Sequence, residues 1–285
     1  MSMATRVNDP DLRQQMAHED LESTAQGLYI IGADGRCYGW MNSHESTEVK
    51  AFLEHGLDLF AKYPPNKIQI QPAVLAQRFS SAPYPSTLVV RVFSRIRPVP
   101  ANSDDTNNSV GRDHLWILAE EAKQIAAHTG QAQFSLPSSL VARLVRYHLI
   151  DNVRGEPDAW NPDEVKRALF TARMVADSGA VKTYEFHGDF AQRTSDNGRG
   201  IEGAIDGRFE ISKSENRASH FRAFAKAIAW GSGRYTQGAP AGRFGMVFAL
   251  IDVNDTISKV VPPEFMGEYG SWDEYLKPET AGADN

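Results

Sequence analysis

Between about residues 181 and 253, apolar and polar residues alternate with a period of two, which is typical of β-strands with one buried face. In the first run, Tyr184, Phe186 and Phe190 share one face. The third run also fits a helix, but its position between two strands favours a strand. We therefore predict a meander of four antiparallel strands, at 182–191, 201–211, 217–230 and 244–253.

Glycines interrupt the apolar face of this meander. Gly188, Gly203 and Gly207 stand where a side chain would otherwise project toward the core. Glycine inside a strand is typical of strong curvature or of close approach by another part of the chain. We therefore expect a bent sheet that wraps around a helix.

Upstream of the meander, apolar residues recur at helical spacing, and we predict three helices there. The third has the clearest start, because Asn161 can cap it and Pro162 suits its first turn. Its apolar stripe runs from Val165 to Val175. The three helices are expected to begin near Asp113, Pro137 and Asn161.

The N-terminal part predicts a ββα unit. Asp34-Gly35 between two apolar runs is a strong hairpin signal, and a helical pattern from Val49 to Phe60 follows. A valine-rich strand at 86–97 precedes a run of small polar residues. We predict an α+β protein whose curved antiparallel sheet, a four-strand meander, packs with helices. Its parts are an N-terminal α/β portion at 1–100, a polar loop or linker at 101–113, and helices plus meander at 114–285.

Composition narrows the class of protein. Lys and Arg number 30 against 36 Asp and Glu, a net charge of −6, whereas proteins held to nucleic acid by phosphate contacts usually have a basic excess. A single cysteine, Cys37, excludes an internal disulfide and a CxxC pair. The N-terminus carries no apolar signal segment, and no run is long enough to span a membrane. We predict a cytoplasmic protein with neither nucleic acid nor membrane as partner.

The densest polar cluster contains the catalytic candidates His148, Asp151 and Glu156. Residues three apart on a helix are neighbours, and a carboxylate can orient an imidazole for proton transfer or metal binding. A structural interpretation is favoured over this one. In it, His148 is a hydrogen-bonded core residue, and Arg154 and Glu156 hold the following loop.

A second cluster lies on the polar face of the meander. His187 and Asp189 project from the same strand face, and Glu202 on the next strand could complete the ligand set of a divalent metal. The simpler interpretation, which we again favour, is the solvent face of an antiparallel sheet, where alternating charges are normal.

Three stretches resemble a domain of uncharacterised bacterial proteins, notably of planctomycete type. They are HLIDNVRGEPDAW at 148–160, FHGDF at 186–190 and GIEGAIDGRFE at 200–210. The resemblance spans about 86–265 and implies no assigned activity. Separately, LYIIGADGRCYGW with its helix resembles the terminal ββα of thioredoxin-like folds, but the CxxC motif of that family is absent.

Together these patterns favour a soluble, non-catalytic module that binds a small molecule or a protein partner inside the sheet–helix interior, without a cofactor. The alternative is a metal-assisted or acid–base enzyme that uses His148 with Asp151 and His187 with Asp189. The sequence leaves the ligand and the oligomeric state open.

Overall fold

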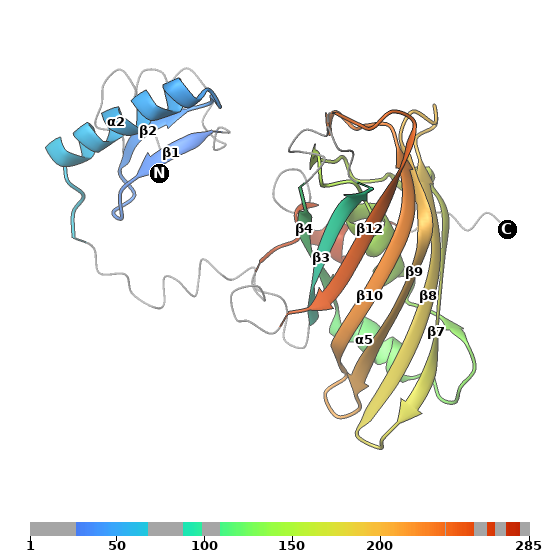
Figure 1. The fold of residues 1–285 in the computed structure, drawn as a ribbon. Coiled ribbons are helices and arrows are strands. Elements are labelled where there is room, and N and C mark those ends of the chain that lie inside the picture. Colours follow the sequence, from blue (N-terminus) through green and yellow to red (C-terminus); the bar gives the residue numbers. More distant parts are fainter. Residues whose placement is uncertain are drawn as a thin grey trace. The chain divides into compact units, whose positions relative to one another are not determined.

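The computed structural model describes residues 27–67, 88–98, 109–236, 238–253, 261–265 and 272–279. The chain divides into two compact units, Met1–Arg78 and Phe79–Asn285 (Figure 1).

The smaller unit contains the predicted ββα arrangement. Strands β1 (Leu28–Ile31) and β2 (Cys37–Met41) pair antiparallel, and helix α2 (Ser46–Lys62) follows them. Gly56 lets the helix approach β1, because a Cβ there would lie 2.1 Å from Ile30. The ββα prediction is confirmed for the described residues.

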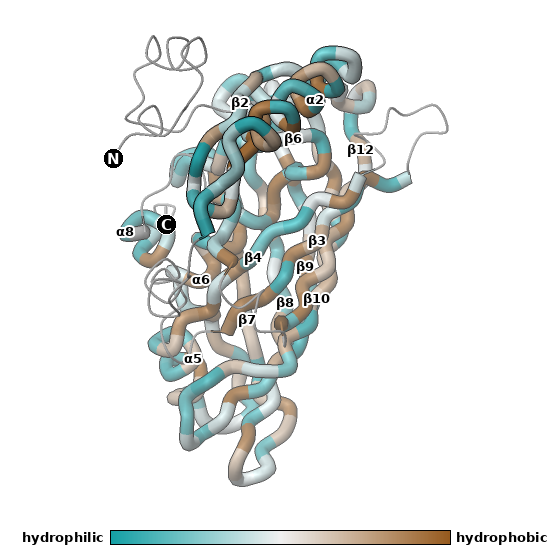
Figure 2. The backbone as a smooth tube through the Cα atoms, turned by 90° about the vertical axis from the view of Figure 1, so that its left-hand side faces the viewer, coloured by the Kyte–Doolittle hydropathy of each residue, from teal (hydrophilic) through white to brown (hydrophobic). Residues whose placement is uncertain are grey.

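The larger unit is built on one antiparallel sheet of eight strands, in the order β4-β3-β12-β10-β9-β8-β7-β5. The alternation of hydrophobic and hydrophilic residues along its long strands is visible in Figure 2. The strands are β3 (Leu88–Arg97), β4 (Gly111–Ile117), β5 (Phe134–Ser135), β7 (Val165–Asp177), β8 (Val181–Arg193), β9 (Gly200–Ser212), β10 (Arg217–Trp230) and β12 (Arg243–Asp252).

Short helices lie on the inner side of this sheet (Figure 1). A separate two-stranded ladder joins β6 (Gly155–Glu156) to β11 (Tyr235–Thr236). The helices are α5 (Ala119–Ala126), α6 (Ser138–Arg143), the π-helix η2 (Leu144–His148), the 3₁₀ turn η3 (Pro162–Glu164) and α8 (Trp272–Leu276).

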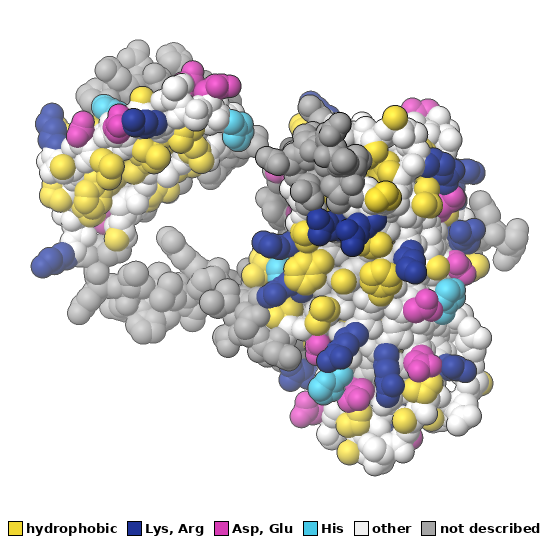
Figure 3. Space-filling view, in the orientation of Figure 1, with side chains coloured by type: hydrophobic (Ala, Val, Ile, Leu, Met, Phe, Trp, Pro, Cys, Tyr) yellow, Lys and Arg dark blue, Asp and Glu magenta, His cyan; other side chains and the backbone are white. Residues whose placement is uncertain are grey.

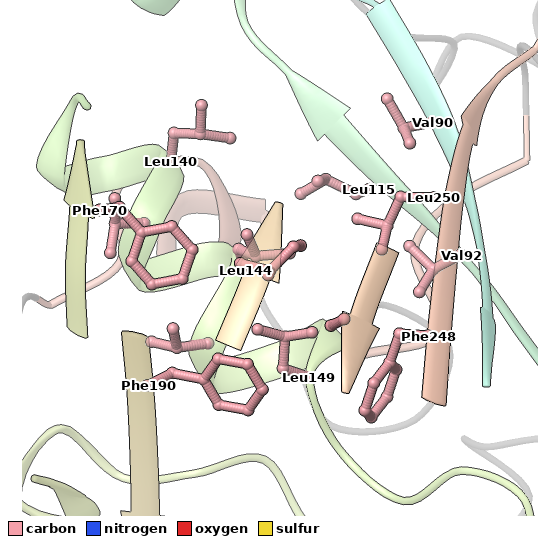
Figure 4. Close-up of a cluster of buried hydrophobic side chains, with 14 of the residues drawn as sticks. Val90, Val92, Leu115, Leu140, Leu144, Leu149, Phe170, Phe190, Phe248 and Leu250 are labelled. Atoms are coloured by element: carbon pink, nitrogen blue, oxygen red, sulfur yellow. The ribbon is translucent and has the colours of Figure 1, made fainter. Parts of the chain in front are cut away.

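Side chains fill the space between the sheet and these helices. In Figure 4, Leu140, Leu144 and Leu149 lie among aromatic and aliphatic side chains of the strands, and all three are buried. A cavity in this core, between Leu144 and Phe209, measures only about 20 Å³, which is room for about one water molecule. The core therefore leaves no space there for the interior ligand that the sequence suggested, and a ligand site must lie elsewhere.

The predicted α+β fold class is wrong. Of the residues that the structure describes, 46% lie in strands and 21% in helices, and the sheet has eight strands rather than a meander of four. The four predicted strands are all present, as β8, β9, β10 and β12. The additional strands come mainly from segments that we had assigned to helices or to the other unit.

Two predicted helices are strands over part or all of their length. The third predicted helix is β7, because its residues pair along their length with β8, and the helix start signals produce only η3. The first begins as β4, and only Ala119–Ala126 is helical. Residues 88–97, which we had placed in the N-terminal portion, form β3 of the large sheet. Of the predicted linker, Gly111–Asp113 belongs to β4, and 101–108 lies outside the described residues.

The inner-face glycines explain how the long strands pack closely. A Cβ on Gly188 would lie 2.4 Å from the ring of Phe170, and one on Gly207 would lie 2.2 Å from the ring of Phe186. These two positions therefore accept an aromatic ring of a neighbouring strand where a side chain would otherwise stand.

Candidate functional site

A chain of three buried polar side chains connects β4, η2 and α8. His148 Nδ1 lies 2.6 Å from Asp113 Oδ2, and His148 Nε2 lies 2.8 Å from the hydroxyl of Tyr275. The side chain of His148 is 0% exposed and that of Asp113 only 3%. His148 is thus a buried, hydrogen-bonded residue, in agreement with the structural interpretation of the sequence.

The hydrogen bonds around this chain indicate one arrangement of protons. The Tyr275 oxygen accepts a hydrogen bond from the main-chain N–H of Trp116, at 3.2 Å. The hydroxyl proton can then point to His148 Nε2, while Nδ1–H donates to Asp113. In this arrangement both ring nitrogens are used inside the protein, which leaves the imidazole no lone pair or proton for a substrate.

Asp113 receives more hydrogen bonds than the one from His148. Its other oxygen accepts the main-chain N–H of His114 at 2.6 Å and that of Glu264 at 2.8 Å. Burial acts to raise the pKa of Asp113, but attraction to His148 and these hydrogen bonds outweigh it and hold the pKa below its ordinary value. Burial raises the pKa of Tyr275, so its hydroxyl stays protonated.

Asp151 does not join His148. Its carboxylate accepts hydrogen bonds from Arg154 Nε at 2.6 Å and from the main-chain N–H of Val153 at 3.1 Å. The helix ends at His148, so Asp151 lies beyond its last turn and is not a neighbour on the same face. Arg154 also donates to the carbonyl of Gly231 at 2.9 Å and so holds the loop.

Beside the buried side chains of Asp113, His148 and Tyr275 lies an open cavity of about 470 Å³, which we call the Tyr147 cavity. Its floor includes Tyr147 and Ile150, which are buried, and its rim includes exposed carboxylates. The lining residues are Tyr147, Ile150, Glu156, Pro157, Asp158, Ala159, Tyr235, Pro262, Pro263, Glu264 and Phe265.

Part of the segment 148–160 forms one wall of the Tyr147 cavity. Glu156 pairs with Tyr235 in the β6–β11 ladder, and both line the cavity. Gly155 has φ of +139°, and a Cβ on it would lie 2.2 Å from the Tyr235 carbonyl oxygen. Glycine therefore lets the two walls approach, and Glu156, the third catalytic candidate, is an exposed rim residue.

The opposite wall comes from the segment 261–265. Phe265 stacks on Tyr147 with ring centroids 4.2 Å apart, and Glu264 binds Asp113 through its main-chain N–H. The buried Asp113–His148–Tyr275 chain thus supports this wall from behind, although it does not line the cavity.

The electrostatic character of the Tyr147 cavity is acidic. Glu156, Asp158 and Glu264 contribute carboxylates, whereas Lys, Arg and His do not occur among the lining residues that the structure describes. Two nearby arginines bind main-chain carbonyls: Arg146 donates to Trp160 and Arg199 donates to Asp158, both at 2.8 Å. The guanidinium of Arg199 also attracts the Asp158 carboxylate.

The weak metal candidates lie on the outer face of the sheet. His187 Nδ1 is 2.8 Å from Asp206 and Nε2 is 3.3 Å from Asp189, so Asp189 does lie beside it. The hydrogen bond with Asp206 is the main cause that raises the pKa of His187. Both ring nitrogens of His187 are therefore directed at carboxylates.

The third metal candidate, Glu202, is not part of this group, because it pairs with Arg243. Across the residues that the structure describes, no group of three or more His, Cys, Asp or Glu side chains is arranged to hold a metal ion. Cys37 is buried in the smaller unit, and burial raises the pKa of its thiol.

Comparison with known proteins identified no relative: no protein-family model, curated protein or solved structure matches the chain. None of the helices in the described parts of the chain is long and apolar enough to cross a membrane.

Several residues of this region were missed by sequence reasoning. Asp113 was taken as a helix cap, whereas in β4 it shares the inner face with Leu115 and Ile117. The alternation of GRDHLWI would have indicated a strand with an inward carboxylate. Tyr275 and Glu264 gave no local signal, because their partners are more than a hundred residues away.

Proposed function

We propose that the larger unit is a non-catalytic binding module that takes a small organic cation, such as an amine with an apolar body, in the Tyr147 cavity. The observation that carries this proposal is the lining, which combines an apolar, aromatic floor with three carboxylates. Its volume of about 470 Å³ lies within the range of about 300–1,000 Å³ that is usual for small-molecule sites.

The arrangement suits a ligand with two unlike ends. The apolar end would lie against the floor at Ile150 and Phe265, where contact with water is lost. The positive nitrogen would lie at the rim near Glu156 and Asp158, where both carboxylates are exposed and their attraction is partly screened. Charge at the rim selects cations, and the floor supplies the contact area.

The test compares phenethylammonium with its neutral analogue 2-phenylethanol in ligand-observed NMR titrations of the full-length protein. We expect the cation to bind more tightly. The double variant Glu156→Gln/Asp158→Asn should weaken its binding about 5- to 30-fold, since each partly screened ion pair contributes about 0.5–1 kcal/mol. Both side chains are exposed, so the fold should be unaffected.

The matched control is Glu120→Gln/Glu215→Gln, which removes the same charge from exposed positions that do not line the cavity. It should leave the affinity unchanged. Equal binding of 2-phenylethanol, or equal loss of affinity in both double variants, would contradict the proposal.

The alternative of an acid–base or metal-assisted enzyme gains no support from the positions of its candidate residues. His148 has both ring nitrogens occupied inside the protein, and Asp151 is bound to Arg154 instead. His187 lies between two carboxylates on the outer face. Nothing in the geometry of these residues favours a reaction.

A further inference from the structure

Strand β7 lies at one border of the eight-stranded sheet and is covered there over only part of its length (Figure 1). The last strand, β5, has two residues and pairs with Thr171 and Ala172 alone. One further main-chain bond, from the N–H of Leu136 to the carbonyl of Phe170, adjoins this pairing. Residues 165–169 of β7 therefore pair with β8 on one side and with no other described strand. We call this stretch the open border.

The main-chain groups of Ala168 point to the open border. In a strand the N–H and C=O of one residue point to the same side, and the side alternates from one residue to the next. Phe170 directs its carbonyl toward Leu136, away from β8, so Ala168, two residues earlier, has the same direction. An extended chain lying along the border would exchange hydrogen bonds with Ala168 and continue the sheet.

A groove of about 1,000 Å³ follows the open border, between residues 165–171 of β7 and the helices α6 and η2. Its apolar floor includes Val141 and Val145, which are 8% and 1% exposed. On the outer face of β7, Leu169 also lines the groove and is 65% exposed. Side chains of an added strand alternate in direction, so one set would pack on the floor and the other would lie beside Leu169.

The opposite border of the sheet, at β4, is covered by the chain itself. The main-chain N–H of Trp116 donates to the hydroxyl of Tyr275 at 3.2 Å. The segment 261–265 is attached to the same strand by the hydrogen bond from Glu264 to Asp113. Proteins usually cover or shorten edge strands, because unpaired main-chain groups invite other chains to pair. The open border is accessible in the groove instead.

The open border is positively charged. Lys166 and Arg167 are exposed, and neither forms an ion pair with a carboxylate anywhere in the described ranges of the chain. The ammonium of Lys166 donates to the main-chain carbonyl of Asp163. Asp163 is also the one acidic residue among the described residues that line the groove. A partner that fits this border therefore carries negative charge.

Several exposed cations elsewhere on the sheet have carboxylates of the chain beside them. Arg173 pairs with Glu185 at 3.1 Å, and Lys213 pairs with Asp177 at 2.7 Å. Figure 3 shows Lys and Arg side chains interspersed with Asp and Glu side chains over the larger unit. At the open border, carboxylates from another chain would supply this balance.

A second copy of the chain does not suit the open border. Two β7 strands that paired antiparallel about Ala168 would bring Lys166 and Arg167 of both copies close together. Like charges on neighbouring positions of paired strands are destabilising, whereas opposite charges are favourable. The charge pattern thus favours an acidic segment of a different protein over self-association.

We propose that the open border binds an extended acidic peptide segment of a partner protein, which adds a further antiparallel strand to the sheet. Its main chain bonds to Ala168, and its carboxylates lie beside Lys166 and Arg167. Residues directly opposite each other in a sheet share a face, so the residue opposite Ala168 is an apolar one that faces the groove floor. The groove shares no lining residue with the Tyr147 cavity, so the two proposals can fail separately.

The first test is fluorescence anisotropy of the full-length protein with a labelled peptide of four Glu-Val repeats, which alternates acidic and apolar side chains. A peptide of four Lys-Val repeats is the counterpart and should not bind. The double variant Lys166→Glu/Arg167→Glu should weaken binding of the Glu-Val peptide about 10- to 100-fold, since attraction is replaced by repulsion. Both positions are exposed, so the fold should be kept.

The matched control is Arg208→Glu/Lys226→Glu. It makes the same change of charge at exposed positions of β9 and β10 that do not line the groove. It should bind the Glu-Val peptide like the unmodified protein.

The second test separates strand pairing from charge without changing the protein. If the valines face the groove floor, their N–H groups bond to β7, and the N–H groups of the glutamates point to solvent. A Glu-Val peptide with N-methylated valines should therefore lose its binding. The same peptide with N-methylated glutamates should keep most of it.

Four results would overturn the proposal. Absence of binding by the Glu-Val peptide in low-salt buffer would leave Lys166 and Arg167 as charges that protect an exposed edge. Equal weakening by both double variants would indicate general attraction. Equal binding of the two N-methylated peptides would exclude strand pairing. A dimer in sedimentation equilibrium that the Glu-Val peptide dissociates would assign the open border to a second copy of the chain.

Discussion

Two histidines in the larger unit each have a carboxylate at Nδ1 and a second oxygen at Nε2, yet their surroundings are opposite. His148 lies 2.6 Å from Asp113 with its side chain 0% exposed. His187 lies 2.8 Å from Asp206 with its side chain 51% exposed. The hydrogen bond at Nδ1 is similar in both groups, whereas the partner at Nε2 is a tyrosine hydroxyl for His148 and a carboxylate for His187. The two groups also differ in their access to water.

The difference in access to water decides how much each group contributes to the stability of the fold. Water screens the exposed pair and replaces either partner when it is lost, so such pairs contribute little. The buried side chains of Asp113, His148 and Tyr275 have no water to replace a missing partner. The loss of one therefore leaves the others without a hydrogen bond. This buried chain fastens β4, η2, α8 and the segment 261–265 together behind the Tyr147 cavity, and its role is structural.

The strongest test of the comparison removes the carboxylate that lies at Nδ1 of each histidine. Asp113→Ala leaves the imidazole and the main-chain N–H groups of His114 and Glu264 without this acceptor, and we expect the free energy of unfolding to fall by about 3–5 kcal/mol. Asp206→Ala should cost no more than about 0.5 kcal/mol. Urea denaturation at pH 7 measures both, and similar losses would refute the contrast.

A milder change tests the far end of the buried chain. Tyr275→Phe keeps the ring packing but removes the acceptor of the Trp116 N–H and the donor to His148, so we expect a loss of about 1–3 kcal/mol. Tyr235→Phe, at a position 42% exposed, is the control and should be neutral. A neutral Tyr275→Phe would show that water or another group can satisfy His148.

The smallest effect is the pH dependence of the exposed group. The folded state raises the pKa of His187 above 6.5, so its contribution is complete below about pH 6.5 and is lost as pH rises through the folded pKa. His187→Ala should therefore lower stability by less than about 1 kcal/mol at pH 5.5 and by almost nothing at pH 8.5. NMR titration of the ring should give a pKa above 6.5, and Asp206→Asn should lower it; an unshifted value would contradict this account.

Two segments of similar composition show how far pattern analysis could reach. The run 217–230 and the run 165–177 both contain alanines, arginines and apolar residues that fit a helix or a strand. The strand prediction for the first is confirmed, because its position between strands was used. The helix prediction for the second is wrong, since the signals at Asn161 and Pro162 describe only a local turn. Pairing with β8 then outweighs weak local preference.

The candidate sites were predictable in part. The burial of His148 and the anchoring role of Arg154 followed from the apolar stripe and the loop composition. The partner of His148 did not, because Asp113 is 35 residues away on a strand that we had taken for a helix start. The Tyr147 cavity combines residues from distant parts of the chain, at 147–159, at Tyr235 and at 262–265, which local patterns could not bring together.

By itself, the sequence determined which residues of a strand share a face, the hairpin at Asp34-Gly35 and the buried character of Tyr184, Phe186 and Phe190. Alternation and turn chemistry act over a few residues, so they can be read locally. Only the tertiary structure decided which strands are neighbours. Because β12 pairs with both β3 and β10, it brings Arg91 and Arg222, distant in sequence, to either side of Ile251. The Tyr147 cavity likewise exists only because segments distant in sequence meet there.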